Sequence, residues 1–228
     1  MYPTARPRVK ICCISSIEEA QLAIRYGASA LGLVSAMPSG PGVIEEAQIA
    51  CIAATIPPTV ASFLLTSQQD ADAVIEQQRR CRVNTLQLVD SFPFDGYKKL
   101  REALPGIALV QVVHVTGEAS LEEAVMIAPH VQAILLDSGN PALSVKELGG
   151  TGRIHNWEIS RKIREAVDVP LFLAGGLNME NVALAIKTVQ PFAIDICSGV
   201  RSNGRLDEAK LARFFRQVAL AGSVGTGL

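Results

Sequence analysis

The chain has 228 residues, 49% of them hydrophobic and 19% charged, so we expect one large domain with a sizeable core. The formal net charge is -1 and charges of both signs are interspersed, which argues against nucleic acid and anionic membranes as partners. Neither a secretory signal nor an apolar run of membrane length is present, and the five cysteines lack a paired spacing. These features favour a reduced, cytoplasmic protein.

Short apolar segments alternate with longer segments of helical periodicity along the whole chain. The predicted strands are 9–14, 30–34, 60–65, 85–89, 109–115, 133–137, 170–174 and 192–197. The predicted helices are 17–26, 45–55, 69–80, 94–103, 120–128, 157–167, 178–187 and 207–218. Near-continuous apolar strands that alternate with amphipathic helices indicate the α/β class, with a parallel sheet covered by helices.

The number and the character of the strands favour a closed sheet. Eight strands of about equal apolar character predict a (β/α)8 TIM barrel, a single domain over residues 1–228. A doubly wound open sheet is the main alternative, but its edge strands are usually less apolar. Residues 1–8 and 222–228 are expected to be flexible ends.

Glycine-rich turns follow the last three predicted strands, at 149–152, 174–178 and 198–200. Functional groups of such barrels lie at the carboxyl ends of the strands, and turns after strands seven and eight often bind phosphate. Glycine lets backbone N–H groups approach a ligand closely, although most glycine turns are only structural. We predict a phosphate site made of Gly150, Thr151, Gly152, Gly175, Gly176, Ser198 and Gly199.

Polar side chains interrupt the apolar strands at a few positions. Asp137 ends the sixth strand, and Asp195 lies within the eighth. Burial of an unpaired carboxylate is costly, so its place at a strand's carboxyl end favours a catalytic role. Strand alternation puts Lys10 and Cys12 on one face of the first strand. A salt bridge between Asp195 and Lys10, and a packing role for Cys12, are the alternatives.

Two further polar residues carry weaker signals. Gln87 interrupts the fourth strand. His114 ends the fifth strand, where it either faces the pocket or is a neutral side chain with its hydrogen bonds satisfied.

Taken together, these residues resemble the phosphoribosylanthranilate isomerase family of tryptophan biosynthesis. The matching segments occur in the family's order over nearly the whole chain: 10–12, 86–88, 135–138, 149–152 followed by Trp157, 173–178 followed by 180–182, and 195–200. Each segment is a modest signal, but their order is specific to the family.

The resemblance implies an Amadori rearrangement, an internal aldose-to-ketose isomerisation that needs neither cofactor nor metal. Asp137 would be the general acid that protonates the furanose ring oxygen, and Cys12 the general base that removes the proton from C2. Lys10 would lie beside the thiol at the substrate site, and Asp195 would orient the substrate by hydrogen bonding.

The chain departs from the family at several places, among them Val89-Asp90, which stands where the family has His-Gly. Cys13 stands where the family usually has glycine, and the loop 35–43 lacks the arginine that pairs with the anthranilate carboxylate in the family. Arg201 stands where the family often has glutamate. We hypothesise that Arg201 replaces the missing arginine; a solvated loop charge is the alternative.

Three functions follow from the sequence. The first is an authentic phosphoribosylanthranilate isomerase, acting as a monomer or homodimer on a phosphorylated small molecule. The second is a related barrel isomerase for another phosphorylated aminosugar or aldose. The third is a non-catalytic barrel that binds a phosphorylated ligand, which the presence of both Cys12 and Asp137 disfavours.

Overall fold

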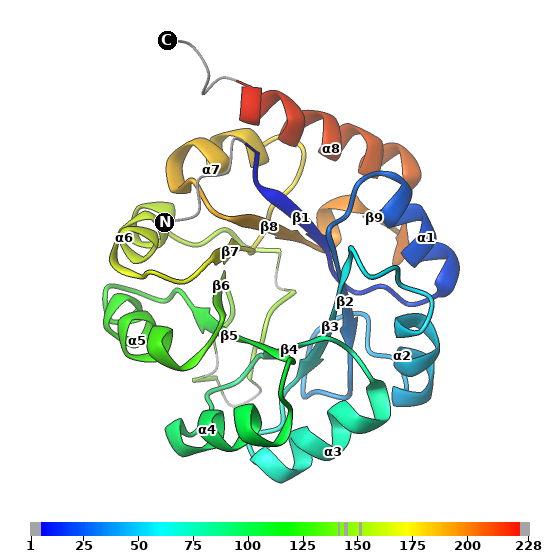
Figure 1. Ribbon diagram of the computed structural model, residues 1–228. Helices are drawn as coiled ribbons and strands as arrows, with labels where there is room; N and C mark the ends of the chain where they lie inside the picture. Colours follow the sequence, from blue (N-terminus) through cyan, green and yellow to red (C-terminus); the bar gives the residue numbers. More distant parts are fainter. Residues whose placement is uncertain (1–5, 141, 144–145, 151, 224–228) are drawn as a thin grey trace.

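Eight parallel strands close into a barrel in the computed structural model, which describes residues 6–140, 142–143, 146–150 and 152–223 (Figure 1). The strands follow one another in chain order, and β8 pairs with β1 to complete the barrel. The helices form a ring around it (Figure 1). The predicted (β/α)8 barrel is therefore confirmed.

The elements alternate as the sequence predicts. The barrel strands are β1 Arg8–Ile11, β2 Ala30–Val34, β3 Ala61–Thr66, β4 Thr85–Leu88, β5 Ala108–His114, β6 Ala133–Asp137, β7 Leu171–Leu173 and β8 Ala193–Ile196. The α-helices are α1 Ile17–Arg25, α2 Glu46–Ala53, α3 Ala71–Cys81, α4 Phe94–Ala103, α5 Ala119–Ile127, α6 Trp157–Ala166, α7 Val182–Val189 and α8 Glu208–Ser223. Short elements complete the chain: the 3-10 helices η1 Ala128–His130 and η2 Ser198–Val200, and the hairpin β9 Arg201–Ser202 and β10 Arg205–Leu206.

Most boundaries shift by one or two residues from the prediction, and two of the larger differences have local reasons. Strand β1 ends at Ile11 rather than at residue 14, because Cys13 adopts a left-handed backbone with φ 62°. Helix α7 begins at Val182 rather than at residue 178, because the Asn178 side chain accepts hydrogen bonds from the amides of residues 180 and 181 and forms a turn.

Some residues of the predicted flexible ends belong to regular elements. Arg8 already belongs to β1, and its guanidinium lies 4.4 Å from the centre of the Phe192 ring. Helix α8 continues through residue 222 to Ser223. The remaining residues of that prediction, 1–5 and 224–228, lie outside the described residues.

Two apolar layers hold the barrel together. The larger one lies between the strands and the surrounding helices, and includes Ile11, Leu33 and Leu64 from the outward faces of the strands. The smaller one fills the barrel, where the rings of Phe63 and Phe172 meet edge to face at 5.7 Å. Strand residues alternate between these layers, as the pleat requires.

A buried ion pair lies inside the barrel at the junction that closes it. Lys10 and Asp195 are register partners on β1 and β8, and Lys10 Nζ lies 2.8 Å from Asp195 Oδ2. Burial alone would lower the pKa of Lys10, but the facing Asp195 carboxylate outweighs it and raises the pKa above its usual value. The salt-bridge interpretation of these two residues is therefore confirmed.

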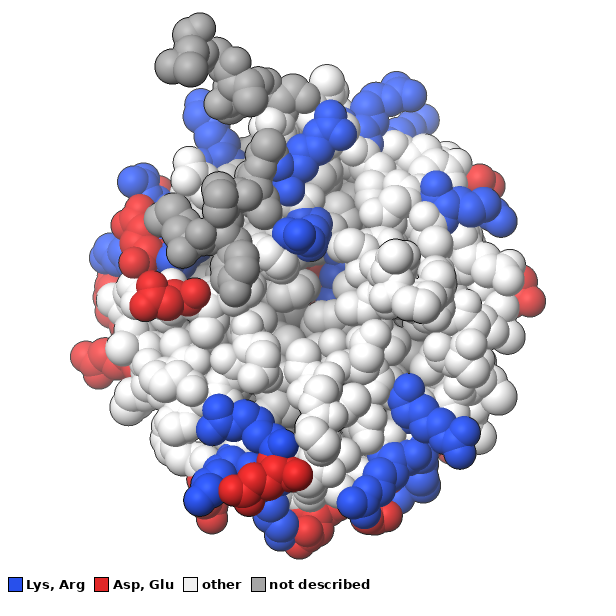
Figure 2. All heavy atoms as spheres, viewed as in Figure 1, with Lys and Arg blue, Asp and Glu red and all other residues white. Residues whose placement is uncertain are grey.

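The outer surface carries mixed charge. On the face shown in Figure 2, basic and acidic side chains both lie around the circumference, and a few basic side chains also lie near the central hollow. In the part of the chain that the structure describes, no helix has the length and apolar character that a membrane crossing requires.

Replacing Lys10 should destabilise the fold, because the Asp195 carboxylate would keep its burial and lose its partner. We expect Lys10→Met to lower the free energy of unfolding by about 3–5 kcal/mol, measured by urea denaturation. Lys98→Met, at a lysine whose side chain is 76% exposed, is the matched control and should stay near wild type. An unfolding midpoint for Lys10→Met equal to that of the control would contradict this assignment.

Candidate active site

A cavity of about 660 Å³, its open mouth included, lies at the carboxyl ends of the barrel strands. Most predicted site residues line it, namely Cys12, Asp137, Gly150, Gly152, Gly175, Gly176, Asp195 and Ser198. Lys10, Gly199 and Arg201 are not among the lining residues, and Thr151 lies outside the described residues. The closure of the barrel therefore brings together groups that are far apart in the sequence.

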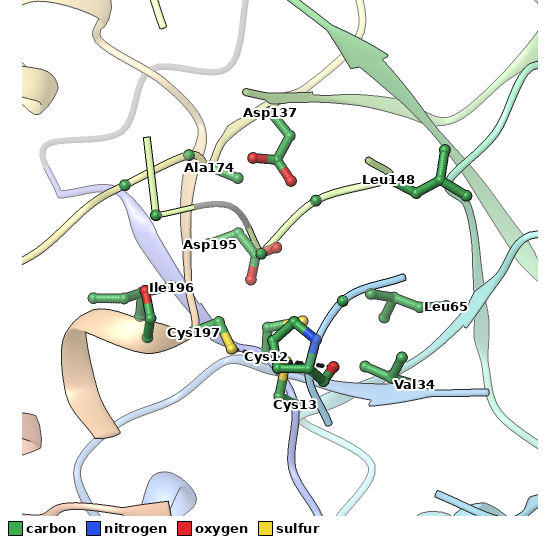
Figure 3. Close-up of a pocket in the computed structure, with 18 of the residues that line it drawn as sticks. Cys12, Cys13, Val34, Leu65, Asp137, Leu148, Ala174, Asp195, Ile196 and Cys197 are labelled. Atoms are coloured by element: carbon green, nitrogen blue, oxygen red, sulfur yellow. Dashed lines mark hydrogen bonds between the residues drawn. The ribbon is translucent and has the colours of Figure 1, made fainter. Parts of the chain in front are cut away.

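The thiols and the carboxyl group of Asp137 face each other across the cavity. Cys12 directly follows β1, and Asp137 is the last residue of β6. Figure 3 shows Asp137 on one side, the sulfur atoms of the three cysteines on the other, and Asp195 between them. This arrangement can present a proton donor and a proton acceptor to opposite sides of one ligand.

The surroundings of Asp137 favour its protonated form, as a proton donor requires. It opens onto the cavity, but protein surrounds its carboxyl group, and burial raises its pKa above the usual value. The hydrogen bond from the Ser138 amide, at 2.7 Å, and the charge of His114 oppose this shift only in part. A Cβ on Gly149 would lie 2.6 Å from Asp137 Oδ2, so the loop after β6 packs directly on the acid.

The two carboxylate oxygens of Asp195, a residue that lines the cavity, have different surroundings. Oδ2 accepts the hydrogen bond from Lys10, whereas Oδ1 is buried and has no hydrogen-bond partner among the described residues. Because an unpaired buried oxygen is costly, a ligand hydroxyl is its natural partner. Lys10 is fully buried beneath this carboxylate and reaches the cavity only through it.

Cys13 occupies a position built around its side chain. Its Sγ lies 3.5 Å from the Pro41 carbonyl oxygen and 2.8 Å from Cys197 Sγ. A Cβ on Gly42 would come within 2.5 Å of the Cys13 Cβ, so only glycine fits opposite this residue. The loop after β2 and the residue after Cys12 are therefore adapted to each other.

The structure does not place Arg201 in the pocket, which corrects the hypothesis that it binds the substrate. Its side chain is only 8% exposed, and Nη1 lies 3.0 Å from Glu19 Oε1. Nη2 donates to the carbonyl oxygens of Cys12 and Cys13. Arg201 thus ties α1 and the hairpin after β8 to the turn that carries Cys12, which is a positioning role.

The predicted phosphate turns stack on one another at the rim. Gly175 and Gly176 have φ values of 82° and 61°, which favour glycine. A Cβ on Gly176 would lie 2.7 Å from the Arg153 carbonyl oxygen, in the turn after residue 152. A Cβ on Gly199 would lie 2.3 Å from the Leu177 carbonyl oxygen, so Gly199 serves packing between the turns rather than the cavity surface.

The two other polar residues of the strands, Gln87 and His114, lie in different places relative to the cavity. Gln87 lines the cavity, and its buried Oε1 lacks a partner within the described ranges; its place in an apolar strand was the signal. His114 is buried, its Nε2 lies 2.9 Å from the Val89 carbonyl oxygen, and it is the register partner of Asp137. His114 therefore lies behind the acid and not on the cavity surface.

One wall of the cavity is apolar and uncharged. It is formed by Val34, Met37, Pro41, Leu65 and Leu148. Neither lysine nor arginine occurs among the lining residues that the structure describes. An aromatic group of a ligand fits such a wall. The described lining offers no lysine or arginine to pair with a carboxylate on that ligand.

Comparison with known proteins gives one consistent family. The family model described as "N-(5'phosphoribosyl)anthranilate (PRA) isomerase" matches residues 9–217. The N-(5'-phosphoribosyl)anthranilate isomerase of Methanocella arvoryzae is 35% identical over 91% of this chain and 95% of its own length. The N-(5'-phosphoribosyl)anthranilate isomerase 2 of Methanosarcina mazei is 34% identical over 91% of this chain and 92% of its own length.

Solved structures agree with this result. The phosphoribosyl anthranilate isomerase of Thermotoga maritima superposes with a TM-score of 0.80 at 29% identity, covering 93% of this chain and 98% of that one. A phosphoribosyl anthranilate isomerase in complex with reduced 1-(o-carboxyphenylamino)-1-deoxyribulose 5-phosphate superposes with a TM-score of 0.78 at 28% identity, with the same coverage. By sequence and by fold, the chain belongs to the N-(5'-phosphoribosyl)anthranilate isomerase family.

Proposed function

We propose that this chain converts N-(5'-phosphoribosyl)anthranilate into the corresponding 1-deoxyribulose 5-phosphate by an Amadori rearrangement, in tryptophan biosynthesis. The observation that carries the proposal is the placement of Cys12 and Asp137 across one cavity that glycine-rich turns border. Family membership supplies the substrate class.

Asp137 acts first, as the general acid. It protonates the furanose ring oxygen, the bond from that oxygen to C1 breaks, and the nitrogen lone pair forms the C=N bond of a Schiff base. The raised pKa that burial gives Asp137 supports this role, because the group keeps its proton at a higher pH than an ordinary aspartic acid.

Cys12 acts second, as the general base in its thiolate form. It removes the proton from C2, and the electrons of that bond form the enolamine, which then tautomerises to the ketone. The unpaired Oδ1 of Asp195 accepts a hydrogen bond from a sugar hydroxyl and orients C2 toward the sulfur. The Arg201 guanidinium donates to the backbone carbonyl oxygens of Cys12 and Cys13 and so keeps the turn that carries Cys12 in place.

The phosphate binds in the turns that follow β6, β7 and β8. Gly150, Gly152, Gly175, Gly176 and Ser198 line the cavity there. Thr151, the remaining residue predicted for these turns, lies outside the described residues. Phosphate binding at this rim is common in barrels of this type, since backbone N–H groups can approach the oxygens closely.

The apolar wall suits the aromatic ring, but it raises a second candidate function. Within the described lining no lysine or arginine is available for the anthranilate carboxylate. A carboxylate that loses water without gaining a cation binds poorly. A phosphoribosyl amine without that carboxylate is therefore the alternative substrate.

We place the enzyme in the cytoplasm, as a monomer or a homodimer. Its membership of a biosynthetic enzyme family supports the cytoplasmic location. The related enzyme of Thermotoga maritima is dimeric, and a structure of its monomers has also been solved.

Removing either proton-transfer group should abolish turnover while the fold persists. We expect Cys12→Ser and Asp137→Asn each to lower kcat by about 10²–10⁴, because each loses one general acid–base step. The fluorescence decay of freshly prepared N-(5'-phosphoribosyl)anthranilate measures the rate, and circular dichroism checks folding. Cys81→Ser, at a buried thiol on α3, is the control. Full activity in either variant would refute its assigned role.

The pH dependence should reveal the buried acid. The rate should fall as the pH rises through the elevated pKa of Asp137, because the proton needed by the ring oxygen is then lost. The Asp195 charge contributes to raising that pKa, so Asp195→Asn should move the alkaline limb to lower pH. Asp72→Asn, at an aspartate that is 69% exposed, should leave the limb in place. An alkaline limb that shifts upward in Asp195→Asn would contradict the assignment.

The two candidate substrates can be separated by one comparison. The phosphoribosyl adducts of anthranilate and of aniline differ only in the carboxylate, so the ratio of their kcat/KM values measures what it contributes. If this enzyme acts on the anthranilate adduct, that adduct should be preferred. A preference for the aniline adduct would favour the second candidate. An increase in thermal stability with either adduct, without turnover, would indicate a binding protein.

A further inference from the structure

Two thiols outside the proposed reaction meet at the wall of the cavity. Cys13 Sγ and Cys197 Sγ are 2.8 Å apart, and both residues line the cavity beside Cys12 (Figure 3). A disulfide has an S–S length of about 2.05 Å, so the two sulfur atoms need to approach by only about 0.8 Å.

The backbone brings these two sulfurs together. Cys197 follows β8, and Cys12 continues the pairing of β1 with β8 through a 2.8 Å hydrogen bond from its amide to the Ile196 carbonyl oxygen. The left-handed backbone of Cys13 comes directly after this bond, and Gly42 leaves room for its side chain. The contact between the two thiols is therefore already present in the folded barrel.

The two thiols have opposite tendencies to ionise. The hydrogen bond with Cys13, and then the charge of Arg201, lower the pKa of Cys197 despite its burial. Hydrogen bonds with Cys12 and Cys197, together with burial, raise the pKa of Cys13. A pair in which one thiol ionises more readily than its neighbour is suited to oxidation by a small oxidant.

We propose that Cys13 and Cys197 form a dithiol modification site, which a peroxide converts to an intrachain disulfide beside the Cys12 thiol. The Cys197 thiolate attacks one peroxide oxygen, the O–O bond breaks, and a sulfenic acid and hydroxide form. The Cys13 sulfur then displaces the sulfenic oxygen, which leaves as water with the Cys13 proton, while the hydroxide takes up a proton. The two thiols lose two electrons, and hydrogen peroxide is reduced to two waters.

The disulfide alters a wall of the cavity. The Cys13 sulfur lies 3.5 Å from the Pro41 carbonyl oxygen, so its movement into a disulfide changes the contact between the loop after β2 and the end of β1. Cys13 directly follows Cys12, so the approach of its sulfur to Cys197 also disturbs the turn that carries the Cys12 thiol. The oxidised enzyme should therefore lose turnover until a thiol reductant restores both thiols.

Peptide mapping tests the site without reference to activity. The full chain is treated with hydrogen peroxide, its free thiols are alkylated, and it is digested with trypsin. The sequence places Cys12 and Cys13 in the peptide 11–25 and Cys197 in the peptide 188–201. We expect these two peptides to be cross-linked, and to separate after treatment with dithiothreitol.

Single substitutions identify the partners. Cys13→Ser and Cys197→Ser should each abolish the cross-link, whereas Cys51→Ser, at an exposed thiol on α2, should keep it. A cross-link that persists in Cys13→Ser would show that Cys12 is the partner and would overturn the proposal. So would the absence of a cross-link at peroxide concentrations that oxidise Cys51 in the wild type.

Activity gives a second, separable result. Each protein is compared with its own reduced form, so that a lower basal rate in a variant does not matter. Wild type should lose turnover with peroxide and recover it with dithiothreitol, and Cys197→Ser should lack the recoverable part. A recoverable loss of equal size in Cys197→Ser would contradict the effect on the cavity. If the reduced enzyme turned over no substrate, the proposed function would fail while the peptide map would still decide the dithiol site.

Discussion

The buried ion pair between Lys10 and Asp195 is the interaction on which the closed barrel and its site both depend. It joins β1 to β8, the two strands whose pairing turns a sheet into a barrel. It also compensates the charge of a carboxylate that would otherwise be too costly to bury, and leaves Asp195 Oδ1 without a hydrogen-bond partner among the described residues. The charge of Asp195 raises the pKa of Asp137 and the charge of Lys10 lowers it, so the ion pair helps to determine the pKa of the proposed acid.

Three departures from the family pattern, at Cys13, at Arg201 and in the loop 35–43, form one local arrangement rather than separate changes. Cys13 takes a left-handed backbone that costs a residue other than glycine about 1 kcal/mol. Arg201 offsets this cost by donating to the carbonyl oxygen of Cys13, and Glu19 holds the guanidinium in place. Gly42, in the loop without a basic residue, makes room for the Cys13 side chain. Cys13, Arg201 and the loop after β2 thus pack around one turn at the end of β1.

Much of this could be predicted from the sequence, because it depends on local patterns. Alternating apolar strands and amphipathic helices predicted the barrel, and position at a strand end singled out Asp137. The interpretation of Arg201 was wrong because its partner Glu19 is 182 residues away, a separation at which sequence carries no pairing signal. The early end of β1 depends on the backbone angle of Cys13, which only the contacts with Arg201 and the loop after β2 explain.

The most direct test of the acid–base assignment is a crystal structure of this enzyme with reduced 1-(o-carboxyphenylamino)-1-deoxyribulose 5-phosphate, the ligand solved with a relative. The assignment predicts that Cys12 Sγ lies against C2 of the ligand, that the Asp137 carboxyl group lies at the oxygen released from the ring, and that the phosphate lies in the turns after β7 and β8. A ligand bound with its sugar carbons away from Cys12, or with its phosphate against the apolar wall, would contradict it.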